Sequence, residues 1–205
     1  YEHFVFITGI TKFTQISLFS VLNNLSNISF TPEYAAICGI TEEEIEENFM
    51  PEIRQMSEAN NWSMQETHDR LKAYYDGYHF SRRNMVDVYN PYSLVNALKS
   101  KEIINFWASS GATSLLPKFV DNAELRISNF ENIRIMRNTL ELSDVSGGGA
   151  ELFLYQSGYL TIKESDEFGY ILGFPNEEVK QALYEMVLPA LTLREKSDIQ
   201  SIQAN

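Results

Sequence analysis

The sequence predicts a mainly α-helical protein with a minor β component, which places it in the α+β class. Two amphipathic segments that begin with helix-capping residues, 41–56 and 63–75, fill much of the first half of the chain. Residues 4–8 form an uninterrupted apolar run that is typical of a buried strand. Two short apolar segments on either side of a polar turn, 159–163 and 170–174, predict a β-hairpin near the C-terminus.

Composition limits the kinds of partner that this chain is expected to have. Its 205 residues are 44% apolar, which is sufficient for one domain or two small ones with a real core. With 16 basic and 28 acidic residues the net charge is −12, so we expect no direct binding of nucleic acid. No apolar run approaches the roughly 20 residues of a membrane helix. The single cysteine, Cys38, lies in an apolar stretch and is expected to be a buried, inert thiol in a reducing cytoplasm.

The N-terminal strand prediction has consequences for the whole chain. The run Phe4–Ile7 has no polar alternation, as in a central parallel strand that is covered on both faces, and it ends in Thr8-Gly9. The carboxyl ends of such strands are where α/β sheets bind ligands. Because one strand cannot form a parallel sheet, we interpret the chain as the C-terminal part of a larger protein. Alone, the exposed strand is expected either to pair with another copy or to be poorly ordered.

The middle of the chain carries clear helix signals. Thr41 with Glu44 forms a capping box at the start of one helix, and Pro51 predicts a kink or a break within it. Ser63 with Glu66 forms a second capping box, and the helix that follows ends at Asp76-Gly77. The sequence therefore predicts two helices between residues 41 and 75. If Pro51 breaks the first of them, there are three, with short connections.

Segments between and after these helices predict turns, a further helix and a hairpin. Residues 76–89 are expected to form a short hairpin or extended loop, with residues 81–84 as its polar tip. Asn90-Pro91 predicts a new helix, because Asn is a good N-cap and Pro suits the first helical position. A further short helix is expected at 112–120. Residues 121–149 leave two alternatives open, a strand or an irregular crossing.

The C-terminal third has the outline of a winged-helix-like unit. A helix that ends at Ser157-Gly158 precedes the predicted hairpin, and a long helix begins after Pro175-Asn176. The turn of the hairpin, the wing, is acidic over residues 164–167. An acidic wing repels phosphate, so docking to protein is favoured over binding to DNA.

Several stretches of the chain resemble the AAA-ATPase-like proteins of bacteria, in that family's order and over nearly the whole chain. They are FVFITGITKFTQISLFSVLNNL (4–25), YAAICGITEEEIEENF (34–49), LKAYYDGYHFS (71–81), VYNPYSLVNALKS (88–100), FWASSGATSLL (106–116), LYQSGYLTIK (154–163) and LGFPNEEVKQAL (172–183). The family's phosphate-binding GxxxxGK[ST] loop and its acidic Mg²⁺-binding strand do not occur in these 205 residues.

The resemblance implies a division of the chain into parts. Residues 1–30 would be the end of a P-loop ATPase core, 31–125 a helical lid and 126–205 a winged-helix-like region. ATP and Mg²⁺ would be bound with the N-terminal core that carries the absent motifs, so no cofactor is expected for this segment alone. A PD-(D/E)XK nuclease-like domain often follows in relatives and is an expected partner. The resulting function is to couple ATP hydrolysis to such an effector domain.

Four residues are candidates for contact with the nucleotide. The resemblance places Thr8 at the first sensor position, where a side chain on a rigid strand bonds the γ-phosphate or the attacking water. Lys12 lies in the same loop and can approach a phosphate as a point charge. Arg82 and Arg83, an adjacent basic pair, are candidates for sensing nucleotide from the lid or for binding an acidic partner. For Lys12 and the arginine pair, a solvated loop is the simpler interpretation.

The residues alone allow two further interpretations. His79 with Asp76 resembles a general base with its orienting acid, but side chains around an Asp-Gly turn diverge and no nucleophile accompanies them. We therefore favour packing of aromatic rings around a capped turn. The rival to the ATPase function is a non-catalytic interaction module whose acidic helical surface, rich in glutamate over residues 42–47, binds a basic partner.

Overall fold

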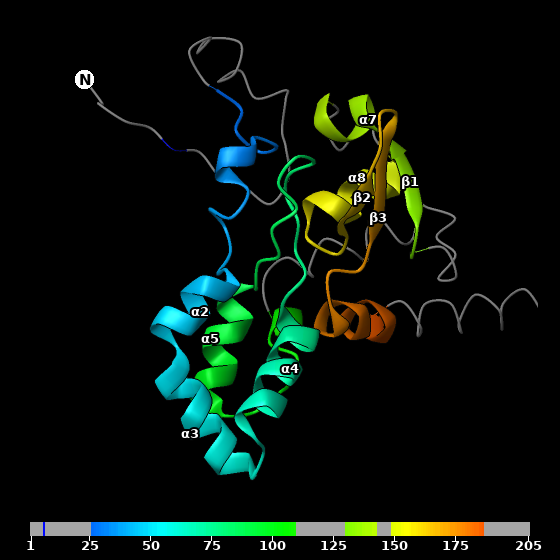
Figure 1. The fold of residues 1–205 in the computed structure, drawn as a ribbon. Coiled ribbons are helices and arrows are strands. Elements are labelled where there is room, and N and C mark those ends of the chain that lie inside the picture. Colours follow the sequence, from blue (N-terminus) through cyan, green and yellow to red (C-terminus); the bar gives the residue numbers. More distant parts are fainter. Residues whose placement is uncertain (1–5, 7–25, 110–129, 143–148, 187–205) are drawn as a thin grey trace, which may run out of the picture.

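The computed structural model describes residue 6 and residues 26–109, 130–142 and 149–186 (Figure 1). Apart from Phe6, the predicted strand at 4–8 lies outside the described residues, as do Thr8, Lys12 and the predicted helix at 112–120. The described part mixes helices with a small antiparallel sheet, which confirms the α+β class. None of its helices is long and apolar enough to cross a membrane.

Four helices form a helical lobe, drawn in cyan to green in Figure 1. They are α2 (Glu42–Asn48), α3 (Met50–Asn60), α4 (Met64–Tyr75) and α5 (Pro91–Ser100). Their buried side chains form one apolar cluster, which includes Ile45, Ile53, Met56, Leu71, Tyr75, Leu94 and Leu98. A short 3-10 turn, η1 (Pro32–Tyr34), precedes the lobe, and a second, η2 (Trp107–Ser109), follows it.

Local capping accounts for where these helices begin. The amide of Glu44 donates to the Thr41 hydroxyl and the Thr41 amide donates to the Glu44 carboxylate, so the predicted capping box is confirmed. The break at Pro51 is also confirmed, since α2 ends at Asn48 and α3 starts at Met50. Asn90 accepts two backbone N–H groups at the start of α5, as expected of a strong N-cap.

Only one of the two hydrogen bonds of the second capping box is present. Ser63 accepts the backbone N–H of Glu66 at 3.0 Å, which confirms the start of α4. The Glu66 carboxylate, however, pairs with Arg70 one turn later, at 2.9 Å. Because Arg70 offers a charged, planar donor on the same helix face, it competes successfully with a neutral amide for the carboxylate.

A three-stranded antiparallel sheet lies beside the helical lobe. Its strands are β1 (Ile133–Met136), β2 (Thr161–Ser165) and β3 (Gly169–Gly173), in the order β1-β3-β2. The predicted hairpin is therefore confirmed as β2–β3, with a bulge between Ile162 and Glu164. For residues 121–149 the sequence allowed a strand or an irregular crossing. The structure has a strand, β1, over part of that range, followed by the short helix α7 (Arg137–Leu142). Helix α8 (Gly149–Gln156) precedes β2, and residues 177–186 are helical after β3.

A second apolar cluster holds together the sheet, α7, α8 and the helix at 177–186, which we call the sheet unit. It includes Phe130, Ile135, Leu152, Phe153, Leu160, Leu172, Val179 and Leu183, and it also takes in Tyr78, Val88 and Trp107. The last three residues precede the sheet unit in the chain by many positions. Residues 78–88, which we call the strap, therefore pack with the sheet while both their ends join helices of the helical lobe (Figure 1).

Two sequence expectations about individual side chains are wrong. Cys38 is exposed, because the segment after η1 runs over the surface before its backbone pairs at Ile40 with Tyr89. Ser81, expected in a polar tip, is fully buried, because its hydroxyl bonds a backbone carbonyl of the segment that precedes η1. Of the two alternatives for residues 76–89, a short hairpin or an extended loop, the structure has the extended loop, with one bridge between Tyr78 and Val88 and no strand.

Candidate functional site

A polar hollow of about 380 Å³ lies between the tip of the strap and the sheet unit. We call it the arginine hollow. It is lined by Asn27, Phe30, Thr31, Pro32, Ser81, Arg82, Arg83, Glu141 and Tyr170. Three separate parts of the chain meet there: the segment before η1, the tip of the strap, and the sheet with helix α7. Tertiary structure thus brings the predicted Arg82 and Arg83 together with residues that the sequence did not connect to them.

Hydrogen bonds hold the tip of the strap in one conformation. The buried Ser81 hydroxyl donates to the carbonyl of Phe30 at 3.3 Å and accepts the backbone N–H of Arg83 at 3.4 Å. The Asn84 side chain donates to the carbonyl of Pro32 at 3.1 Å. The backbone that carries the two arginines is therefore attached at two points to the segment before η1.

The two guanidinium groups of this tip have no carboxylate partner among the residues that the structure describes. By contrast, Arg70, Arg134 and Arg137 each lie against a carboxylate. Arg82 is half-buried and Arg83 is exposed. Burial and a hydrogen bond to Glu141 raise the pKa of Tyr170, and the nearby charge of Arg82 acts in the opposite direction. Arg82 thus lies near Tyr170 and contributes a positive charge to the lining of the hollow.

Aromatic rings and one acid complete the lining. Phe30 stacks between Tyr155 and Tyr170, with ring centroids 6.1 Å and 6.2 Å away. The Tyr170 hydroxyl donates to Glu141, which also lies 3.9 Å from the Arg137 side chain. The hollow thus combines cationic donors with two rings of a packed aromatic cluster and one acid that already has partners.

The base of the strap forms a second polar cluster. His79 contacts Asp87 across the strap at 2.6 Å and donates from its other ring nitrogen to the carbonyl of Ile162 at 3.0 Å. The Thr161 hydroxyl accepts from the His79 amide and donates to the His79 carbonyl. These bonds attach the strap to β2 in place of a further strand.

An acid–base pair would need Asp76 to orient His79. Asp76 does not do so, because the ring nitrogens of His79 contact Asp87 and the Ile162 carbonyl. Asp76 is 3% exposed, and burial raises its pKa to about 6. Lys163 lies nearby, with its ammonium donating to the carbonyl of Pro175 at 3.2 Å, and burial lowers its pKa. The structure therefore agrees with the structural interpretation of the Asp-Gly turn, with His79 serving as a cross-strap tie.

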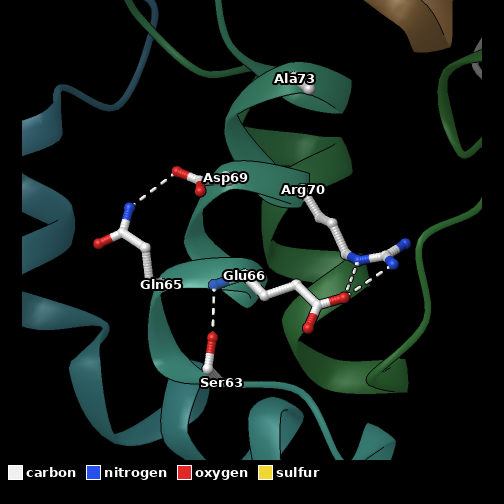
Figure 2. A pocket seen from close by; sticks show the side chains of 6 residues that line it. All are labelled: Ser63, Gln65, Glu66, Asp69, Arg70 and Ala73. Atoms are coloured by element: carbon white, nitrogen blue, oxygen red, sulfur yellow. Dashed lines mark hydrogen bonds and ion pairs between the residues drawn. The ribbon is translucent and has the colours of Figure 1, made fainter.

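A larger hollow lies on the outer face of α4 (Figure 2). Its side chains are paired along the helix: Gln65 donates to Asp69 at 2.8 Å, and Arg70 pairs with Glu66. Arg70 also lies 4.4 Å from the centre of the Trp62 ring. Because these polar groups are satisfied within one helix, this face is a solvated surface and offers no converging set of donors. Within the described residues, no group of three or more His, Cys, Asp or Glu is placed to hold a metal.

Sequence reasoning found two of the residues that line the arginine hollow and missed the others. Arg82 and Arg83 stood out as a basic pair in an acidic chain. Phe30, Glu141 and Tyr170 carried no local signal, because nothing in their neighbourhoods predicts that they meet. A serine beside an arginine pair is the only hint that Ser81 anchors the tip.

Comparison with known proteins yields a relative of undescribed function. A protein of Azotobacter chroococcum mcd 1, described as "Uncharacterized protein in vnfD 5'region", is 30% identical over 206 residues, or 96% of this chain. The chain spans 37% of the length of that relative. No protein-family model matches the chain, and no solved structure matches it.

Proposed function

We propose that this chain is the sensor, lid and winged-helix portion of an AAA-type ATPase. The proposal starts from the motifs that resemble the AAA-ATPase-like proteins. The structural observation that supports it best is the arginine hollow, which holds Arg82 and Arg83 against residues 27–32. That segment follows Thr8, the proposed sensor, at a short distance in the chain. In this proposal the basic groups of the lid contact the nucleotide.

Each part of the chain has a role in this proposal. Thr8 would bond the γ-phosphate or the attacking water, and Lys12, Arg82 and Arg83 would contact phosphate oxygens. ATP and Mg²⁺ would be held by a core outside this chain. The helical lobe would act as the lid, and helix α8, the β2–β3 hairpin and the helix at 177–186 as the winged-helix-like unit. The acidic turn of that hairpin favours docking to protein over DNA.

The length of the relative is compatible with this arrangement. Since the chain spans 37% of that protein, there is room for both an ATPase core and an effector domain such as the PD-(D/E)XK nuclease-like domain. A non-catalytic interaction module is the second candidate, favoured by the exposed glutamates of α2. A GxxxxGK[ST] loop upstream of Tyr1 in the full gene would decide for the ATPase.

The substitution Thr8→Ala in the full-length protein tests the proposal directly. We expect kcat for ATP hydrolysis to fall by at least about tenfold, because a sensor contact acts chiefly in the transition state. ATP affinity should change little, and Thr8→Ser, which keeps the hydroxyl, should retain most of the activity. Unchanged turnover in Thr8→Ala, or an equal loss of nucleotide binding, would contradict the sensor role.

A further inference from the structure

We propose that the arginine hollow is a phosphate-binding site that is complete within this chain. The idea that a nucleotide supplies the phosphate rests on the proposed function, but the site itself does not. All the groups that would bind the anion belong to described residues of this chain. Binding should therefore be measurable in the absence of an ATPase core.

Charge is the first argument. The chain has a net charge of −12, yet Arg82 and Arg83 both line this hollow and have no carboxylate partner among the described residues. Glu141, the one acid of the lining, accepts from Tyr170 and lies near Arg137. An anion in the hollow would be attracted by the charges of both arginines. Phosphate suits this position because its oxygens match the planar donors of arginine.

Rigidity is the second argument. The tip of the strap is held by Ser81 and Asn84, whose side chains donate to carbonyls of Phe30 and Pro32. The backbone at Arg83 is oriented by its own bond to the Ser81 hydroxyl. A loop whose backbone is already ordered loses less conformational freedom when it binds a ligand. Asn27 and Thr31 also line the hollow and offer neutral polar groups near the arginines.

Shape indicates which compounds carry the phosphate. The hollow of about 380 Å³ is large for an inorganic phosphate and falls within the range of small-molecule sites. Phe30 and Tyr170 also line the hollow, but Tyr170 is 1% exposed and the Phe30 ring already stacks on Tyr155 and Tyr170. These rings therefore bound the hollow, and the arginines supply the groups that bind. A phosphate that carries a further phosphoryl or organic group fills this volume better than inorganic phosphate does.

The experiment titrates phosphate, pyrophosphate and ADP into the 205-residue chain at low ionic strength, by calorimetry and by NMR. We expect saturable binding, with similar affinities for ADP and pyrophosphate, because both present a diphosphate to the arginines. The double substitution Arg82→Gln/Arg83→Gln should weaken binding by at least about tenfold, since charge-assisted hydrogen bonds are lost. Arg54→Gln, which removes an exposed cation from α3, is the matched control and should change affinity less than about twofold.

A substitution that removes a negative charge distinguishes binding in the hollow from nonspecific attraction of anions to exposed cations. Glu141→Gln keeps an acceptor for Tyr170 but removes a negative charge from the lining, so it should strengthen binding by about threefold or more. Equal weakening by Arg54→Gln, or no saturable binding of any of the three compounds, would overturn the proposal. Equal affinity for pyrophosphate and ADP would support the phosphate site and exclude a bound base.

Circular dichroism and thermal melts of each variant verify that the fold is kept. The outcome is independent of Thr8→Ala in the full-length protein, because no ATP is hydrolysed in this assay. A chain that binds phosphate while Thr8→Ala hydrolyses ATP normally would keep the site and reject the sensor role.

Discussion

The side-chain amide of Asn176 donates to the backbone carbonyl of Asp76 at 3.0 Å, across 100 positions of the sequence. The same side chain accepts the backbone N–H of Val179 at 3.1 Å, at the start of the helix over residues 177–186. Asn176 thus caps one helix while it bonds Asp76, the C-cap residue that follows α4. One buried side chain attaches the helical lobe to the sheet unit.

Asn176→Ala should destabilise the protein by about 2–3 kcal/mol, since it removes an N-cap and leaves a buried carbonyl without its donor. Asn176→Asp should cost less, because the aspartate keeps the cap. Urea unfolding measures both. Asn96→Ala is the control, as its side chain bonds only within α5, to the Tyr92 carbonyl. A loss of stability that is equal for Asn176→Ala and Asn96→Ala would argue against the joining role.

Gly77→Ala should be strongly destabilising. Gly77 has a positive φ of 94°, and an added methyl group would run into the carbonyl of Pro175. We expect a loss of more than about 2 kcal/mol in the free energy of unfolding, from the strained φ together with the clash. Gly158→Ala is a matched control: φ is 83°, but the nearest atoms would be 3.9 Å away. It should cost about 1 kcal/mol. Similar losses in the free energy of unfolding for the two variants would show that the backbone at Pro175 shifts at little cost to relieve the clash.

Asp76 should make stability depend on pH between about 4 and 6. Burial raises its pKa from 3.8 to about 6 in the folded protein, so the folded state holds this proton more tightly than the unfolded state. The free energy of unfolding therefore falls as the pH rises through this window, by up to about 3 kcal/mol.

Asp76→Asn removes this contribution and keeps the shape of the neutral acid. The variant should show a flatter pH profile than the wild type, and it should be the more stable of the two at pH 7. Glu178, whose pKa is also raised by burial, acts in the same direction and is present in both proteins. The difference between the two profiles therefore isolates Asp76. Parallel profiles would contradict its burial as an acid.

Glu178 should be needed as an acceptor rather than as a charge. Its carboxylate accepts the backbone N–H groups of Phe106 and Trp107 at 2.8 Å and 2.9 Å, and it is fully buried. Glu178→Ala leaves both donors unsatisfied and should cost about 3–5 kcal/mol. Glu178→Gln keeps an acceptor oxygen and should cost clearly less. Chemical denaturation with the exposed Glu177→Ala as control measures these effects; equal losses for Ala and Gln would show that the charge matters.

Features that depend on neighbours in the sequence could be predicted. The capping box of Thr41 and Glu44 and the cap at Asn90 join residues two or three positions apart, and the break at Pro51 depends on the proline itself. Such bonds form whenever the local backbone turns, whatever surrounds it. The α+β class and the C-terminal hairpin follow from the same kind of local pattern. Arg82 and Arg83 could be singled out because basic pairs are rare in this acidic chain.

The surroundings of these residues were decided only by the tertiary structure. Ser81 is buried because it meets Phe30, 51 positions earlier, and Asp76 has a raised pKa because distant elements cover it. No local pattern encodes such meetings, since they depend on how two separate cores pack and on which chain segments the packing brings together. The sequence by itself determined the helices, the hairpin and the arginine pair; folding determined that the pair lines a hollow together with Phe30 and Tyr170.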